Sequence, residues 1–376
     1  MTRAGYDEVV LLTGFPSFRA RRMAEEIVSR EAPRALVHAV VHPKLRKDAE
    51  SALDGLPLDA RRRVQLIEGD AAAMDLGLSG KEVRALAREV DRIHHCVQVS
   101  YVGAERAVAE QVNVGSAYEV LEIARACEHL KCLVVHSSAS VSGDRAGVVR
   151  EADLDRGQRY RNPVEETLAR AERVYRRAMT GKGAVPIAVL RPTILVGDSQ
   201  TGEVDRLEGP YLLILLMLAA PPDFVLPIPG RTDVPLNLVP IDFVTKAALH
   251  IGRDVRAPGR TFHLVDPHPL ASRKVIELVA HAGGRRVPSA FLPTNLTRAL
   301  LRAPGLERIV KSPRAFFEAM ILPVTYDHAG ADELLEGTGI TCPPLSSYVD
   351  HLVSHVQKWL EARGERRDAE QHDPLA

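Results

Sequence analysis

The first 197 residues alternate short apolar runs with longer amphipathic stretches, and this alternation limits the possible fold more than any other feature. Each run, such as "EVVLLTG", "ALVHAVVH" or "CLVVHSSAS", has the length of a buried strand, and the intervening stretches have helical spacing. Strands that alternate with helices form parallel sheets joined by crossover helices. About six such units predict an α/β fold with a doubly wound, Rossmann-like parallel sheet.

After Gly197 this alternation gives way to loops rich in Pro and Gly. We therefore expect a dinucleotide-binding domain at 1–198 and a smaller substrate lobe at 199–365. Within the lobe, the segment at about 233–266 is expected to return and complete the main sheet, and 366–376 forms a polar tail. The apolar run at 211–218, "YLLILLML", is interpreted either as the wall of an acyl pocket or as a core helix.

Composition narrows the classes of partner. The 49 Lys and Arg residues balance the 49 Asp and Glu residues, so no overall charge favours nucleic acid or an anionic membrane. Four cysteines without CxxC or zinc-ligand spacing predict reduced thiols, no metal site and a cytoplasmic location. The longest apolar stretch is well short of the roughly 20 residues that cross a bilayer, so no membrane span is expected. A small lipophilic ligand is the remaining expectation.

The stretch "TGFPSFRA" ends the first strand and precedes the first helix, which is where a glycine-rich turn holds a pyrophosphate. Gly14 takes the first glycine position of such a turn. Ser17 and Ala20 take the second and third, and Ser17 adds a Cβ atom where a phosphate needs close approach. Taken alone, this segment is better interpreted as an ordinary strand-to-helix turn.

Seven segments taken together resemble the extended short-chain dehydrogenase/reductases, and most closely the branch of thioester and fatty-acyl reductases. The resemblance covers about residues 8–355, and its segments are "TGFPSFRA", "EGD", "VNVGS", "HSSASVSGD", "VLRPTILVGDSQTGE", "LNLVPIDFV" and "FHLVDPHPLA". It implies a cofactor across the carboxyl ends of the strands. The positions that would contact this cofactor are Gly14, Ser17, Phe18, Ala20, Lys44, Asp70, Val97 and Pro192.

The second strand ends without an Asp or Glu that would accept a hydrogen bond from a ribose 2′-hydroxyl. It offers His42, Lys44, Arg46 and Lys47 instead, and these cations suit a 2′-phosphate. If a dinucleotide binds, NADP(H) is therefore favoured over NAD(H). A solvated surface run explains the same residues equally well.

The fourth strand departs from the family pattern, which has small residues near the nicotinamide ribose. Here Val97 and Gln98 follow His95 and Cys96, and they add bulk where the cofactor would lie. Cofactor binding is therefore expected to be weakened or lost. A shifted strand register is the alternative interpretation.

Family chemistry requires a Ser or Thr, a Tyr, and a Lys four residues after the Tyr. Ser138 matches the hydroxyl position, and His136 is a second catalytic candidate. In "NPVEETLARAE", however, Val164 takes the Tyr position and Leu168 the Lys position, and none of the eight tyrosines is followed by a Lys four residues later. Without a phenol and its ammonium neighbour, a loss of roughly 10²–10⁴-fold in rate is expected for carbonyl reduction.

Three functions remain open at this point. The first is a non-redox enzyme of the cyclase or condensation type, which acts on a lipophilic or carrier-bound carbonyl compound through Ser138. The second is a catalytically silent binding protein, which the resemblance suggests would pair as a homodimer through 115–128 and 163–180. The third is an NADP(H) oxidoreductase with an unconventional proton donor.

Overall fold

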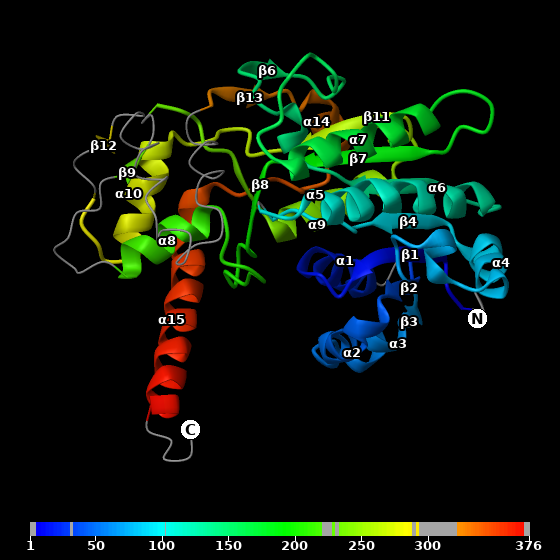
Figure 1. The fold of residues 1–376 in the computed structure, drawn as a ribbon, viewed down its shortest axis with the longest axis horizontal. Coiled ribbons are helices and arrows are strands. Elements are labelled where there is room, and N and C mark those ends of the chain that lie inside the picture. The colour runs from blue at the N-terminus through cyan, green and yellow to red at the C-terminus, as the bar shows by residue number, and fades with distance from the viewer. Residues whose placement is uncertain are drawn as a thin grey trace. The chain divides into compact units, whose positions relative to one another are not determined.

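The computed structural model describes residues 5–30, 33–101, 103–219, 228–229, 233–287, 291–292 and 322–371 (Figure 1). The chain divides into two compact units, and each is described by itself. The first comprises Met1–Thr193, Phe243–Val265 and Thr325–Thr341, and the second comprises Ile194–Asp242, Asp266–Val324 and Cys342–Ala376.

The first unit is built on a seven-stranded sheet. Its strands are β1 (Glu8–Phe15), β2 (Ala35–Val41), β3 (Val64–Glu68), β4 (Arg92–His95), β5 (Cys132–His136), β7 (Ile187–Pro192) and β11 (Arg260–Leu264). The order is β11-β7-β5-β4-β1-β2-β3, and every neighbouring pair is parallel. The predicted doubly wound parallel sheet is confirmed. The order reverses between β1 and β4, which is the point where such sheets bind ligands.

Helices cover both faces of this sheet, which is why the strands are continuous apolar runs rather than alternating ones. Every residue of β2 and of β5 is buried. In this unit lie α1 (Phe18–Ser29), α2 (Arg46–Asp54), α3 (Leu58–Arg62), α4 (Gly80–Glu89), α5 (Arg106–Ala109), α6 (Ser116–Ala126), α7 (Pro163–Ala178), most of α9 (Ile241–Arg253) and α14 (Ala329–Leu335). One core joins β1 and β4 to α4, α6 and α7, and α6 and α7 run side by side (Figure 1).

A short two-stranded sheet joins segments that are far apart in the sequence. It consists of β6 (Gly147–Val149) and β13 (Val324–Tyr326). The backbone N–H of Asp327 donates to the Val149 carbonyl oxygen at 2.9 Å. This pairing places the start of α14 beside the residues that follow β6.

The second unit packs α8 (Pro210–Ala219), α10 (Ser272–Ala282) and α15 (Val349–Gln371) around its own apolar core. Two short parallel pairs accompany them, β8 (Ile194–Val196) with β10 (Leu238–Pro240) and β9 (Ile228–Pro229) with β12 (Phe291–Leu292). Tyr211, Leu213 and Ile214 are buried in this core, so the apolar run at 211–218 is a core helix. The same residues line a small apolar cavity.

No helix in the described ranges has both the length and the apolar character required to span a membrane.

Candidate functional site

The predicted phosphate turn is a tight strand-to-helix connection. Gly14 has a φ of +88°, and a Cβ atom there would lie 2.9 Å from the carbonyl carbon of Cys96, so only glycine fits. The Ser17 N–H donates to the Gly14 carbonyl oxygen at 2.9 Å, and the Ser17 side chain makes no capping bond to α1. Phe18 and Ala20 are buried beneath the turn. The backbone therefore makes a tight turn that requires glycine at Gly14.

Arg19, in the first turn of α1, was missed by sequence reasoning. Its Nη1 donates to Gln98 Oε1 at 2.6 Å and to the His136 carbonyl oxygen at 3.5 Å. Burial lowers the pKa of the guanidinium, and the nearby Cys96 thiol opposes this effect. The available signal was a charged residue between the apolar Phe18 and Ala20.

Gln98 thus has a defined partner, and Val97 before it is also half-buried. The hydrogen bond joins α1 to the segment that follows β4, on either side of the point where the strand order reverses. The side chains of Val97 and Gln98 therefore occupy space beyond the carboxyl end of β4, as the sequence predicted.

The histidines of β4 have partners on different sides. His94 Nδ1 lies 3.3 Å from His136 Nε2, whereas His95 lies 2.9 Å from Thr13 Oγ1 and 3.2 Å from Ser116 Oγ. Burial lowers the pKa of His94 and of His95 to about 3, and that of His136 falls well below its usual value. All three imidazoles are neutral at pH 7 and bind protons weakly, so His136 is a poor general base.

The described residues contain no group of three or more His, Cys, Asp or Glu side chains placed to hold a metal ion.

Ser138 lies two residues after the end of β5 and begins the short helical turn Ala139–Ser142. Its Oγ accepts a hydrogen bond from the Ser140 N–H at 3.2 Å, and the side chain is half-buried. An oxygen that accepts in this way keeps its own proton for donation. Ser138 is thus able to donate a hydrogen bond to a carbonyl oxygen.

Val164 and Leu168 face the protein's own interior. Only 4% of Val164 and 6% of Leu168 is exposed. We call the apolar group around them the α7 cluster, which consists of Val99, Ala104, Ala109, Val141, Leu154, Val164, Leu168 and Ala169. The positions expected for a phenol and an ammonium group are therefore filled by packed hydrocarbon.

The residues in and beside α7 that match the family pattern make contacts that support the fold. Asn162 Oδ1 caps the helix by accepting from the Glu165 N–H at 3.0 Å. Glu165 accepts from Arg161 Nε at 2.9 Å, and Thr167 Oγ1 accepts from Asn113 Nδ2 at 3.0 Å. These contacts fix the start of α7 whether or not the helix takes part in a reaction.

Glu172 holds the same helix to the sheet through a buried ion pair. Its two carboxylate oxygens accept from Arg191 Nε at 2.9 Å and from Arg191 Nη2 at 2.5 Å. Arg176 lies 2.9 Å away, and Ser137 Oγ donates at 3.2 Å. Burial alone would raise the pKa of Glu172, but Arg191 and Arg176 together lower it. The carboxylate therefore stays ionised.

Tyr160 is the tyrosine nearest to the vacant phenol position in the sequence, and it packs against the α7 cluster. Its hydroxyl lies 3.2 Å from Gln158 Nε2 and 3.4 Å from Arg173 Nη2. Burial raises the pKa of this phenol despite the neighbouring Arg173. The structure thus shows no activation of Tyr160 as an acid.

The remaining predicted cofactor positions are spread along the sheet. Asp70 follows β3, and its Oδ1 accepts from the Ala72 N–H at 2.9 Å. Lys44 is exposed after β2, and Pro192 is buried at the end of β7. Of the basic group after β2, Arg46 pairs with Glu50 at 2.7 Å.

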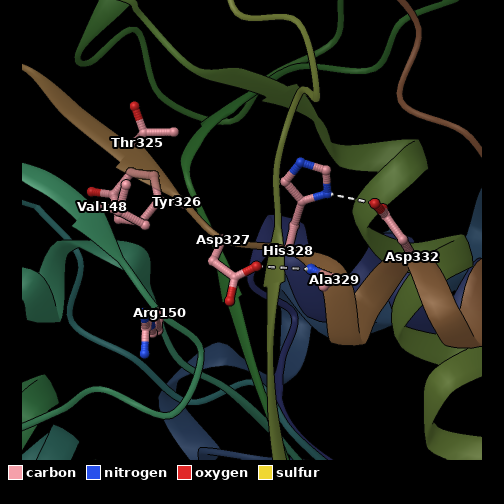
Figure 2. Close-up of a pocket in the computed structure, with 8 residues that line it drawn as sticks. All are labelled: Val148, Arg150, Thr325, Tyr326, Asp327, His328, Ala329 and Asp332. Atoms are coloured by element: carbon pink, nitrogen blue, oxygen red, sulfur yellow. Dashed lines mark hydrogen bonds and ion pairs between the residues drawn. The ribbon is translucent and has the colours of Figure 1, made fainter.

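A cavity of about 500 Å³ lies elsewhere in the first unit, beside β6, β13 and the start of α14 (Figure 2). Figure 2 shows His328 facing Asp332, with 2.8 Å between His328 Nδ1 and Asp332 Oδ2. Arg150 and Tyr326 also line this cavity. None of the residues predicted from the sequence lines it, and it brings together segments about 180 residues apart in the chain, for which no sequence signal was available.

The residues present fit a dinucleotide only in part. Gly14 allows the tight turn between β1 and α1, which is the role of the first glycine of such a motif. Beyond the carboxyl ends of β1 and β4, however, the Arg19 side chain is bonded to Gln98. A dinucleotide lying across the strand ends would contact these two side chains.

Comparison with known proteins agrees with the fold. Residues 12–248 match the family model NAD_binding_4, described as "Male sterility protein". A component of the linear gramicidin synthase of Brevibacillus parabrevis is 26% identical over 230 residues, which is 59% of this chain and 4% of that protein. Fatty acyl-CoA reductase wat of Drosophila melanogaster is 23% identical over 291 residues, covering 66% of this chain and 54% of that protein.

Among solved structures, the terminal R domain from the myxalamid PKS-NRPS biosynthetic pathway has a TM-score of 0.76 at 22% identity. The match covers 94% of this chain and 91% of that domain. The two curated relatives are longer than their matched parts, so this chain corresponds to one portion of each.

Proposed function

The chain belongs to the male sterility family of NAD-binding domains, within the extended short-chain dehydrogenases/reductases. Within this family, we propose a non-reductive role for it. It acts on, or binds, a lipophilic or carrier-bound carbonyl compound without hydride transfer. The burial of Val164 and Leu168 in the α7 cluster is the observation that supports this proposal.

Carbonyl reduction requires a proton to reach the oxygen as hydride reaches the carbon. A phenol with a pKa near 10 does this at neutral pH only when a neighbouring cation lowers its pKa. The α7 cluster supplies neither group, Tyr160 has a raised pKa, and His136 is buried and neutral. Ser138 retains its hydroxyl proton. Polarisation of a carbonyl by Ser138 favours attack by a nucleophile from the substrate itself, as in a condensation or cyclisation.

Two relatives of the chain support a substrate class. One is a fatty acyl-CoA reductase, and another is part of a linear gramicidin synthase. A fatty acyl-CoA is a lipophilic thioester. We therefore propose a thioester, or an aldehyde derived from one, on a carrier or coenzyme.

The test uses the full-length protein with an acyl-pantetheine thioester or a long-chain aldehyde, with and without NADPH. We expect NADPH absorbance at 340 nm to stay at the rate of the no-enzyme control, while mass spectrometry detects a condensed or cyclised product, or calorimetry detects binding alone. A product would identify an enzyme and binding alone a silent receptor. Ser138→Ala should abolish the product, and Ser140→Ala is the matched control.

The alternative is an NADP(H)-dependent oxidoreductase with an unconventional proton donor, and the NAD-binding description of the family favours it. Exposed Lys44 and Lys47 suit a 2′-phosphate, so this alternative requires NADPH to be preferred over NADH. Oxidation of NADPH that depends on the aldehyde would establish it and overturn the non-reductive role.

A further inference from the structure

A cation and a hydroxyl group lie close together beyond the carboxyl ends of β1, β4 and β5. Arg19, in the first turn of α1, donates from Nη1 to Gln98 Oε1 at 2.6 Å and to the His136 carbonyl oxygen at 3.5 Å. His136 is the last residue of β5, and Ser138 lies two residues beyond it, which is at most about 7 Å of chain. Arg19 and Ser138 are therefore within reach of one small ligand.

The guanidinium of Arg19 has no counter-ion among the described residues. Its acceptors, the Gln98 side-chain oxygen and the His136 carbonyl oxygen, are both neutral. Burial lowers the pKa of Arg19, and the nearby Cys96 thiol opposes this effect. That thiol is itself neutral at pH 7, because burial raises its pKa to about 12. Since charges that leave water are normally paired, an anionic group would stabilise this half-buried cation.

Arg19, Gln98 and Ser138 all keep hydrogen-bond donors for a ligand. A guanidinium can only donate, so the Gln98 side chain turns its oxygen toward Arg19 and leaves its NH₂ group unpaired. Within the described ranges, Nε and Nη2 of Arg19 also lack a partner, and none of these three nitrogens is fully buried. Ser138 retains its hydroxyl proton, since its Oγ accepts from the Ser140 N–H. These donors match an oxygen that carries negative charge.

We propose that Arg19, Gln98 and Ser138 form a binding site for the carbonyl or carboxylate oxygen of the substrate, in which Arg19 supplies the positive charge. The oxygen of a carbonyl gains negative charge when a nucleophile adds to the carbon, and donors already in place stabilise that charge. Arg19 would do so without giving up a proton, because a guanidinium stays protonated. The inference rests on the proposed non-reductive function and deepens it.

The direction of the Arg19 side chain favours the substrate over a nucleotide phosphate as its ligand. Its two acceptors lie after β4 and at the end of β5, which are on one side of β1 in the sheet. The predicted cofactor positions Lys44 and Asp70 follow β2 and β3, on the other side of β1. The guanidinium is thus held on the side of Ser138.

The experiment is a calorimetric titration of the full-length protein with octanoate, a carboxylate on a lipophilic chain, and with octanamide, its neutral counterpart. The wild type should bind octanoate more tightly than octanamide. Arg19→Leu should bind octanoate about 10- to 100-fold more weakly, the range that a hydrogen bond to a charged group supplies, and octanamide should lose much less. Arg19→Lys keeps the charge and should recover part of the octanoate affinity.

Gln98→Glu tests the same site while Arg19 is still present. The new carboxylate would supply the missing counter-ion, so octanoate should bind at least about 10-fold more weakly. This variant gives the decision if Arg19→Leu fails to fold. The matched control is Arg22→Leu, which removes a charge from the same helix where the arginine pairs with Glu25. Its dissociation constant for octanoate should stay within twofold of the wild type.

Three results would overturn the site. The first is a wild type that does not prefer octanoate to octanamide, and the second is octanoate affinity that is unchanged in Arg19→Leu and Gln98→Glu. The third is an Arg19→Leu variant that loses affinity for inorganic pyrophosphate but not for octanoate, because the guanidinium would then serve a nucleotide. The proposed function fails separately, by aldehyde-dependent consumption of NADPH by the wild type, which leaves the octanoate ratios as they are.

Discussion

Val164 and Leu168 provide a direct test of the site at the level of single residues. Val164→Tyr adds a ring to a filled cluster, and Leu168→Lys buries an ammonium group. Overpacking costs about 1–3 kcal/mol and an unpaired buried charge costs more, so the double variant should lose about 4 kcal/mol of unfolding free energy. Urea denaturation measures this loss. Leu168→Met, which conserves volume, should lose less than about 1.5 kcal/mol.

The same double variant also tests the chemistry. We expect no NADPH-dependent aldehyde reduction from it, because both substituted positions lie buried in the α7 cluster. A stable double variant that reduces aldehydes would instead identify a reductase disabled only at α7.

Asn113 is a second residue with a measurable contribution. Its Oδ1 accepts from the Val99 N–H at 2.8 Å, and its Nδ2 donates to the Val99 carbonyl oxygen at 3.2 Å and to Thr167 Oγ1. Asn113→Ala leaves buried backbone groups without partners, so unfolding free energy should fall by about 3 kcal/mol. The exposed neighbour Gln111→Ala is the control and should change it by less than about 0.5 kcal/mol in the same urea titration.

At the level of elements, α14 depends on a carboxylate from a distant segment. Glu151 accepts from the N–H groups of Gly330 at 2.9 Å and Ala331 at 3.2 Å, at the start of the helix, and from the His263 N–H at 2.9 Å. Glu151→Ala should therefore lower unfolding free energy by about 1–2 kcal/mol, as the loss of an N-terminal cap does. Thermal denaturation with Glu333→Ala as the control tests this, because Glu333 is exposed and its ion pair with Arg260 contributes little. Equal melting temperatures for the two variants would contradict the capping role.

At the level of the whole molecule, buried neutral histidines predict sensitivity to acid. Burial lowers the pKa of His38 and His263 to about 4, and of His94 and His95 to about 3. The unfolded chain binds these protons below a pKa of about 6.5, whereas the folded protein does not. The stability is therefore fully present only well above about pH 6.5, and it is lost as the pH falls through this value toward the folded pKa values.

Each such histidine costs about 1.4 kcal/mol per pH unit below 6.5. Urea denaturation at pH 7.5, 6.5 and 5.5 should show a loss of several kcal/mol, about three-quarters of it in the last step. His95→Asn should reduce the slope by about one proton, and the exposed His129→Gln should leave it unchanged. A stability that is flat down to pH 5.5 would show that these rings are not held neutral.

The sheet could be predicted from the sequence because its strands are buried on both faces and so appear as uninterrupted apolar runs. The replacement of the expected Tyr and Lys was also visible, since Val164 and Leu168 fall in a fixed register within one helix. What these side chains pack against was not visible, because the α7 cluster draws on Val99, Val141 and Leu154 from separate loops. Likewise Gln98 was noticed but Arg19 was not, since their contact joins residues 79 positions apart.

The ion pair between Glu172 and Arg191 holds α7 against the sheet without involving the positions expected for the catalytic Tyr and Lys. Because this pair and the Asn162 cap hold the helix, volume-conserving changes at Val164 and Leu168 should leave its backbone in place. The position of α7 is thus set by residues other than these two. A library of apolar, volume-conserving pairs at these positions should therefore stay folded.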